Sequence, residues 1–246
     1  MSDSVPRHYQ NQLLQRLSAP DLALIDPYLE HVALPLRTPL ETANSIIENV
    51  YFIEEGIASI VATIPKGGDT EIGLIGSEGM TGVMLILGDD HCVHDTYMQL
   101  AGSGFRVPAA ALVEALAASA SLKTFLLRYV ATLFIQTGFT ALVNARSKLN
   151  ERLARWLLMC HDRAPNDHFY ITHEFMAVML GVRRPGVTVA IQELEGKGLI
   201  RATRGEIVIR DRNGLVRVAD GTYSPAEDEY ERLIGKMNYR YSSQPE

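Results

Sequence analysis

The chain has 246 residues, of which 47% are hydrophobic and 21% are charged, as in a soluble globular protein of one large or two ordinary domains. Its only cysteines, Cys92 and Cys160, are too few for a disulfide framework or a four-cysteine iron–sulfur cluster, and they fit a reducing cytoplasm. The net charge of −6 argues against nucleic-acid binding by the chain as a whole. The first 15 residues lack the apolar segment of a signal peptide.

The N-terminal half is predicted to be a small β domain preceded by short helices. Residues 1 to about 30 are expected to be helical, because Leu13, Leu14 and Leu17 share one helical face. From about 31 to 107, short apolar or alternating runs are separated by glycines, which is typical of an antiparallel roll, barrel or sandwich. The expected strand runs are 50–53, 57–64, 71–75, 84–87 and 96–100.

A long helix is predicted next, over about 121–145. Its segment 129–145 has no charged residue, but it is short for a membrane span and carries several polar side chains, so we expect burial between helices and no membrane contact. Apolar or small residues recur at spacings of three and four, namely Leu126, Val130, Leu133, Thr137 and Ala141. This pattern favours pairing with a second copy of the chain, a two-fold homodimer. Packing against the β domain is the alternative.

A helix-turn-helix pattern follows at residues 172–194. Thr172 can cap the first helix, and Gly181 can end it, since glycine adopts the left-handed conformation of a tight turn. Pro185 suits the first turn of the second helix. The second helix then carries Arg183 and Arg184 at its start, as in helices that enter a DNA major groove. Either Val189 or Ala190 is expected to face inward. A purely structural helical hairpin with a glycine turn is the alternative.

Local charge and a predicted wing support DNA binding. Residues 148–217 contain 12 Lys/Arg and 8 Asp/Glu, a net charge of +4, so the rest of the chain carries −10. Such asymmetry indicates a polyanion partner for this part alone. Two strands, 199–202 and 206–210, are predicted to form the wing of a winged helix. Candidate phosphate contacts are Arg201, Arg204, Arg210 and Arg212.

Five stretches resemble the Crp–Fnr family, the cyclic-AMP receptor protein and its relatives. They are 49–56 (NVYFIEEG), 76–82 (GSEGMTG), 151–158 (ERLARWLL), 180–188 (LGVRRPGVT) and 194–200 (LEGKGLI). The resemblance implies an α+β fold with a cyclic-nucleotide-binding-like β-roll at 1–118, a dimerisation helix at 119–147, a winged helix-turn-helix at 148–218 and a C-terminal tail at 219–246. It also implies a cytoplasmic, homodimeric transcription regulator that binds inverted repeats in double-stranded DNA, with RNA polymerase as a further candidate partner.

The resemblance implies that Arg184 contacts DNA bases, because it matches the first base-contacting arginine of the family's best-known members. Pro185 and Val189 stand where those readers have a glutamate and a second arginine, so the operator sequence does not carry over. Thr172 and His173 are expected on backbone phosphates. The full set of expected DNA contacts is Thr172, His173, Arg183, Arg184, Gly186, Thr188, Gln192 and Arg204.

The family's cyclic-nucleotide signature is degenerate in this chain. Nucleotide-binding members have a glutamate directly after a glycine and, about ten residues later, an arginine for the phosphate. Here the corresponding stretches are Gly82-Val83 and 88–97, without arginine. A buried phosphate without a cation is costly, so we expect no cyclic-AMP binding by the usual mode and no cofactor.

The sequence also bears on metal binding and on catalysis. The run 89–95 contains His91, Cys92 and His94, which suggests a zinc or copper site, but a polar hairpin tip is the simpler interpretation. No phosphate loop, metalloprotease helix or serine elbow is present, so an enzyme is not expected, and His161 and His168 are predicted to be exposed loop residues. The alternative function is a sensor or regulatory subunit that uses the roll without binding DNA.

Overall fold

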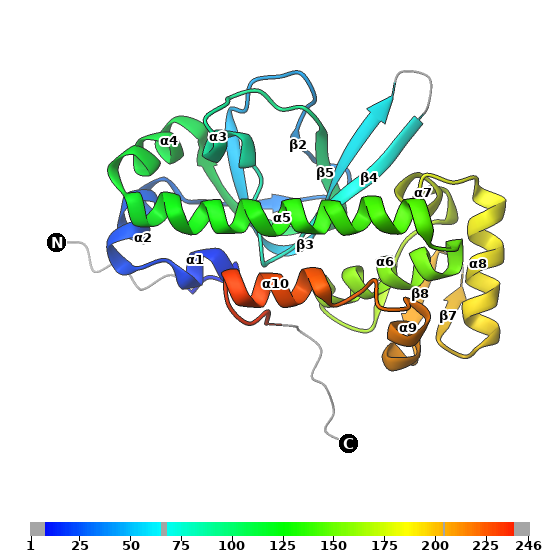
Figure 1. The fold of residues 1–246 in the computed structure, drawn as a ribbon. Helices are drawn as coiled ribbons and strands as arrows, with labels where there is room; N and C mark the ends of the chain where they lie inside the picture. Colours follow the sequence, from blue (N-terminus) through cyan, green and yellow to red (C-terminus); the bar gives the residue numbers. More distant parts are fainter. Residues whose placement is uncertain (1–7, 65–67, 204, 239–246) are drawn as a thin grey trace.

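The computed structural model describes residues 8–64, 68–203 and 205–238. Figure 1 shows a β-roll, a long helix α5 that spans the molecule, and a helical region at the far end of that helix. The roll is introduced by α1 (Gln12–Arg16), α2 (Ala19–Ile25) and the 3-10 helix η1 (Asp26–Tyr28). It comprises β1 (Glu30–Leu34), β2 (Pro39–Glu41), β3 (Asn49–Ile64), β4 (Gly68–Ile75), α3 (Val83–Leu87), β5 (Asp95–Pro108) and α4 (Ala109–Ala118).

The predicted β domain is present as an antiparallel sheet of order β1-β5-β3-β4, with β2 also paired to β5. The runs 50–53 and 57–64 belong to one long strand, β3, whose pairing with β5 is irregular around Gly56. Gly56 has φ +89°, and a Cβ there would lie 2.5 Å from the carbonyl oxygen of Leu100. Only glycine therefore allows the strand to bend at this point without displacing its neighbour.

The strand predicted at 84–87 was wrong, because this run forms helix α3. Gly82 and Gly88 flank the helix, and both adopt left-handed conformations, at φ +79° and +95°. Each glycine turns the chain, and the five residues between them bury Leu85 and Ile86. A short apolar run has too few residues for its periodicity to separate a helix from a strand.

Helix α5 (Ala120–Arg146) packs on the roll with one face. Leu122, Leu126 and Tyr129 lie in the core that also contains Phe52 and Met80 of the roll. The stripe predicted to pair with a second copy lies mostly on this packed face, because Leu126 is buried there and Val130 and Leu133 pack against the same core. The structure thus shows the alternative, packing against the β domain, and leaves the opposite face exposed. By length and composition alone α5 could cross a membrane, and it is the single such helix within the described ranges.

The C-terminal region is a three-stranded wing surrounded by helices. It contains α6 (Leu149–Arg163), β6 (His168–Tyr170), α7 (His173–Met179), α8 (Arg184–Gly196), β7 (Ile200–Thr203), β8 (Glu206–Ile209) and α9 (Arg212–Val218). The sheet order is β6-β8-β7. The predicted wing strands are thereby confirmed. One continuous apolar cluster joins Trp156 and Leu157 of α6 to Ile57, Val61 and Leu74 of the roll, so the two regions share a core.

The chain then returns to the roll. Helix α10 (Pro225–Leu233) lies against α5 (Figure 1). Tyr230, Ile234 and Met237 are buried in the roll's core cluster. The backbone N–H of Asn238 donates to Oε1 of Gln12 at 3.1 Å. The segment after the winged helix therefore connects the far end of the molecule to the first helix of the roll.

Candidate nucleic-acid interface

The first helix of the predicted helix-turn-helix is built as the sequence indicated. Thr172 is the N-cap of α7, and its side chain accepts a 3.1 Å hydrogen bond from the N–H of Phe175. Met176 and Met179 are buried, which holds the helix on the core. Gly181 ends the unit at φ +60°, and a Cβ there would lie 2.9 Å from Oγ1 of Thr70 on β4. The turn thus lies against the roll.

The second helix, α8, has one buried face and one exposed face. Val187, Ala190, Ile191 and Leu194 are buried, which resolves the choice between Val189 and Ala190 in favour of Ala190. Figure 1 places α8 on the outer side of the C-terminal region, away from the roll. The exposed face is therefore free to approach another macromolecule. It carries Arg183, Arg184, Pro185, Val189 and Gln192.

Most of the expected DNA contacts lie close together at the start of α8. Arg183 is the N-cap and Arg184 the first helical residue, and both are exposed. Thr188 is half-buried, and its Oγ1 lies 3.1 Å from Nδ1 of His173 and donates to the Arg184 carbonyl at 3.2 Å. Gly186 is half-buried, and a Cβ there would lie 3.1 Å from Leu149. Thr188 and Gly186 therefore shape the helix start, whereas the two arginines project from it.

One further expected contact lies on the same side. Gln192 is exposed two turns after Arg184 and lines a groove with His173 and Thr188 of the two helices and with wing residues. Arg204 lies outside the described residues. Val189, which is 53% exposed, lies on the same face but was not among the expected contacts. The helical period indicates this position, since Val189 lies one turn after Pro185.

The arginines of the C-terminal region divide into surface and interior groups. Arg201 and Arg210 are exposed. Arg212, another expected phosphate contact, is half-buried and engaged within the protein: its Nη2 donates to Oδ1 of Asp162 at 2.6 Å, and its guanidinium lies over the Tyr223 ring. His161 was wrongly predicted to be exposed. It is 3% exposed within α6, and its Nε2 lies 2.9 Å from Oδ1 of Asp167. The positive charge of this region is therefore only partly on the surface.

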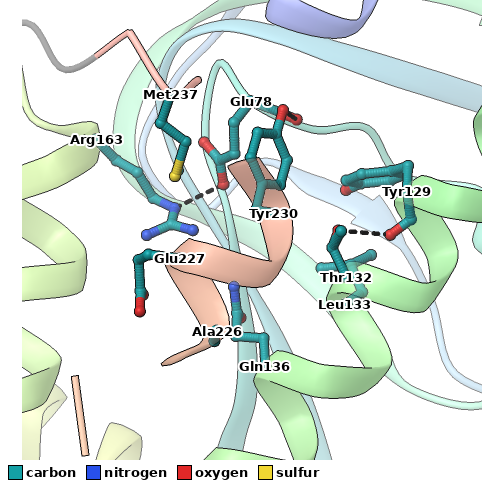
Figure 2. Close-up of a pocket in the computed structure, with 10 residues that line it drawn as sticks. All are labelled: Glu78, Tyr129, Thr132, Leu133, Gln136, Arg163, Ala226, Glu227, Tyr230 and Met237. Atoms are coloured by element: carbon teal, nitrogen blue, oxygen red, sulfur yellow. Dashed lines mark hydrogen bonds and ion pairs between the residues drawn. The ribbon is translucent and has the colours of Figure 1, made fainter. Parts of the chain in front are cut away.

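A network of buried polar contacts joins α6 and α10 to the roll. Nε of Arg163 donates to Oε1 of Glu78 at 2.7 Å, and the Tyr230 hydroxyl donates to the Glu78 carbonyl at 2.7 Å. A small cavity of about 20 Å³ lies beside them, and its other lining residues include Glu227 and Met237 (Figure 2). These contacts fix the C-terminal region on the roll. Sequence patterns gave no signal for them.

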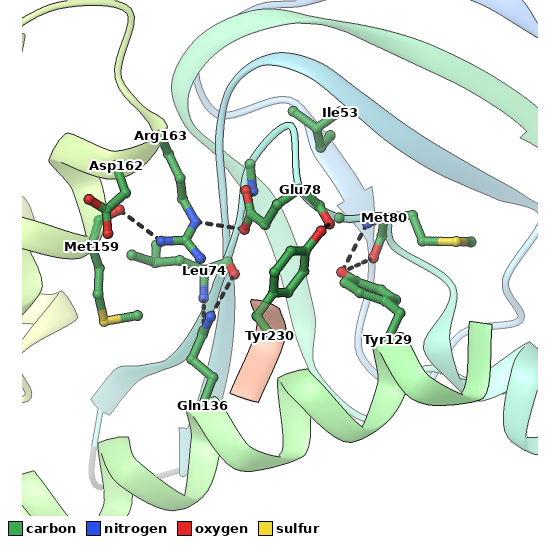
Figure 3. Close-up of polar contacts among 12 residues, drawn as sticks. Ile53, Leu74, Glu78, Met80, Tyr129, Gln136, Met159, Asp162, Arg163 and Tyr230 are labelled. Carbon is green, nitrogen blue, oxygen red and sulfur yellow. Dashed lines mark hydrogen bonds and ion pairs between the residues drawn. The ribbon is translucent and has the colours of Figure 1, made fainter. Parts of the chain in front are cut away.

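Helix α5 is fixed to the same part of the roll by two polar side chains. The Tyr129 hydroxyl donates to the Met80 carbonyl at 2.8 Å and accepts from the Met80 N–H at 2.9 Å. Oε1 of Gln136 accepts from the N–H of Leu74 at 2.7 Å (Figure 3). Burial raises the pKa of the Tyr129 phenol well above its usual value, so the group stays neutral. The end of β4 and the segment after it therefore contact the long helix directly.

The stretches that correspond to the nucleotide signature are occupied by contacts within the protein. The N–H of Gly82 donates to Oε1 of Glu41 at 2.8 Å, and Oγ1 of Thr96 donates to Oε2 of Glu41 at 2.7 Å. Burial raises the pKa of Glu41, and the two hydrogen bonds oppose part of this increase. An acidic side chain thus bridges the two stretches that correspond to the nucleotide signature.

The candidate metal run does not bring Cys92 and His94 together through their side chains. The Cys92 thiol donates instead to the His94 carbonyl at 2.8 Å, and burial raises the pKa of the thiol. The ligand atoms that do converge belong to Asp89, Asp90 and His91, all exposed. Nδ1 of His91 lies 2.6 Å from Oδ1 of Asp90, so these two side chains interact with each other, as polar residues in a turn often do.

Comparison with known proteins agrees with this geometry. Residues 151–218 match the model of the Crp-like helix-turn-helix domain. The chain is similar to a candidate transcriptional regulator of the Crp/Fnr family from Eubacterium rectale, with a TM-score of 0.68 and 19% identity over 84% of this chain and 97% of that one. No curated protein matches the sequence.

Two further solved structures have the same fold. A CRP-family transcriptional regulator from Thermus thermophilus gives a TM-score of 0.63 at 17% identity, and FixK2 from Bradyrhizobium japonicum gives 0.64 at 16%. Each alignment covers 77% of this chain and 96% of the other. The chain thus contains a Crp-like helix-turn-helix domain at residues 151–218 and shares its overall fold with these solved regulators.

Proposed function

We propose that the protein is a transcription regulator that reads DNA with helix α8. The observation that carries this proposal is the exposed pair Arg183 and Arg184 at the N-terminus of a helix whose opposite face is buried. In helix-turn-helix proteins, the first residues of the second helix reach base edges, and arginine pairs with guanine through two hydrogen bonds. The intact turn at Gly181 favours this function over a sensor that does not bind DNA.

Different roles follow for the residues of the exposed face. Arg184 is the main base contact, and Arg183, Thr172 and His173 lie where backbone phosphates would pass. Val189 offers methyl groups, which can contact the methyl group of thymine but form no hydrogen bond with a base. Gln192 suits adenine. The operator is therefore expected to differ from one read by two arginines and a glutamate.

Selection from random duplex DNA tests the proposal. The expected result is one enriched inverted repeat, with half-sites one helical turn apart, bound more weakly as salt increases. Arg184→Ala should lose the preference, whereas Arg232→Ala, an exposed arginine on α10, should keep it. Binding without a preferred sequence, or with no change between these variants, would contradict the proposal.

We further propose that α5 pairs with a second copy of the chain. Its open face repeats at alternating steps of three and four residues, through Leu127, Ala131, Phe134, Gly138 and Ala141. Leu127 is 39% exposed and Phe134 81% exposed. Such spacing forms the seam of a left-handed coiled coil, and the small residues allow close approach of the two helices. A dimer would present two α8 helices to an inverted repeat.

The signal that controls the regulator is proposed not to be cyclic AMP bound in the family's usual mode. This rests on the absence of arginine from residues 88–97 and on the position of Glu41 beside Gly82. Titration calorimetry with cyclic AMP is expected to show no saturable heat. Tight and specific binding would refute this.

A contact with RNA polymerase remains a prediction.

A further inference from the structure

A second small cavity, of about 20 Å³, lies where four parts of the fold meet. It is bounded by the C-terminal end of α5, the first turns of α6, strand β4 and the end of α7. Its polar lining residues are Glu71, Thr140, Asn144, Arg152 and Arg155. Helix α5, the roll and the helix-turn-helix therefore all contribute to the lining of this space. We name it the joint cavity.

Two arginines of α6 bring unpaired donors to the joint cavity. Arg155 is 5% exposed. Its Nε donates to the Thr222 carbonyl at 3.0 Å and its Nη1 to Oγ1 of Thr140 at 3.3 Å. Its Nη2 is buried without a hydrogen-bond partner among the described residues, and so is Nε of Arg152. Burying a charged donor without an acceptor costs folding free energy, so a bound acceptor beside these nitrogens would be stabilising.

The nearby carboxylates do not supply that acceptor. Oε1 of Glu71 takes the indole N–H of Trp156 at 2.8 Å, and its Oε2 takes the hydroxyl of Ser59 at 2.7 Å. Glu78 is engaged by Arg163. Burial raises the pKa of Glu71 to about 7, so its negative charge is only partial at neutral pH. Glu227 attracts Arg155 electrostatically, but no carboxylate accepts a hydrogen bond from either of the two unpaired nitrogens.

We propose that the joint cavity binds one small monovalent anion, of the size of chloride, between Arg152 and Arg155. The volume is about that of a single water molecule, for which roughly 10–15 Å³ is needed. Phosphate esters and nucleotides are too large for it. An anion here would accept from the two unpaired nitrogens and would tie α5, α6, β4 and α7 together. The orientation of the helix-turn-helix on the roll would then depend on the anion.

Thermal unfolding of the whole chain tests the site without DNA. Sodium chloride is titrated against sodium gluconate at constant ionic strength, so that only the small anion changes. The expected result is a saturable increase in Tm of about 3 °C with chloride or bromide, and none with sulfate. An equal Tm in chloride and gluconate, or an equal increase with sulfate, would overturn the proposal.

Two variants and one direct measurement complete the test. Arg155→Gln should abolish the chloride effect. If that variant does not fold, Arg152→Gln, which replaces the less buried arginine, should weaken the effect. Arg232→Gln, on the exposed face of α10, should retain it. In crystals grown with bromide, an anomalous peak is expected between the two guanidinium groups. Density for water alone, with no anomalous signal, would refute the site.

Discussion

The indole Nε1 of Trp156 donates a 2.8 Å hydrogen bond to Oε1 of Glu71, and this bond joins helix α6 to strand β4 of the roll. Glu71 is 5% exposed, and burial raises its pKa to about 7, although the bonds from Ser59 and Trp156 partly oppose this shift. A group that titrates near neutral pH therefore lies in the shared core of the two regions.

Glu71 should make the protein less stable as pH increases toward neutrality. Its folded-state pKa is above the ordinary value of 4.5, so the folded state binds the proton more tightly than the unfolded state. The resulting stability is fully present below pH 4.5 and is lost as pH increases through about 7, a change on the order of 3 kcal/mol at most. Glu71→Gln should remove this part of the dependence.

Urea unfolding between pH 5 and pH 8 measures that dependence. The glutamine side chain keeps an acceptor for Trp156 but does not titrate. Glu114→Gln, an exposed position on α4, serves as the control and should leave the slope unchanged. Equal slopes for the wild-type chain and Glu71→Gln would show that Glu71 does not govern this pH range.

Phe134 should determine whether the chain dimerises. It is 81% exposed on the open face of α5, and a charge there would have to be buried in the proposed seam. Phe134→Glu is expected to sediment as a monomer at concentrations where the wild-type chain is a dimer. Val113→Glu changes a 46% exposed residue on α4 and should not alter the sedimentation. A dimer that survives Phe134→Glu would place the interface elsewhere.

Tyr230 should stabilise the return of the C-terminal segment to the roll. Its hydroxyl donates to the Glu78 carbonyl at 2.7 Å (Figure 3), and both residues are buried. Tyr230→Phe is expected to lower the free energy of unfolding by about 1 kcal/mol, because a buried hydrogen bond is lost. Tyr28→Phe, at a tyrosine that is 48% exposed, should change it much less. The comparison is made by urea unfolding, and a similar loss in both variants would argue against the contact.

Arg183 and Arg184 should affect DNA binding in different ways. Arg184→Ala is expected to cost about 1–3 kcal/mol on the selected site and to relax preference at one base pair. Arg183→Ala should weaken binding to all sequences similarly and reduce the slope of log K against log salt by about 1. Fluorescence anisotropy on specific and scrambled duplexes at several salt concentrations separates the two. Identical behaviour of the variants would reject these separate roles.

The sequence by itself determined the local backbone of the helix-turn-helix. The cap at Thr172, the left-handed turn at Gly181 and the helix start at Pro185 each follow from the chemistry of one residue and its immediate neighbours. Backbone constraints of this kind do not depend on distant parts of the chain. For the same reason the two wing strands and the long helix were predicted near their observed positions.

The tertiary structure alone decided which faces and charges are buried. Ala190 faces inward and Val189 outward because of the way α8 packs on the core of the C-terminal region. The position of a residue along a helix does not by itself show which face of that helix packs on the core. His161 is buried and Arg212 is paired with Asp162 because α6 meets α9 and the segment after it, which no local pattern encodes. The joint cavity likewise depends on four segments far apart in sequence. Burial is a property of the assembled chain, and so are the electrostatics that follow from it.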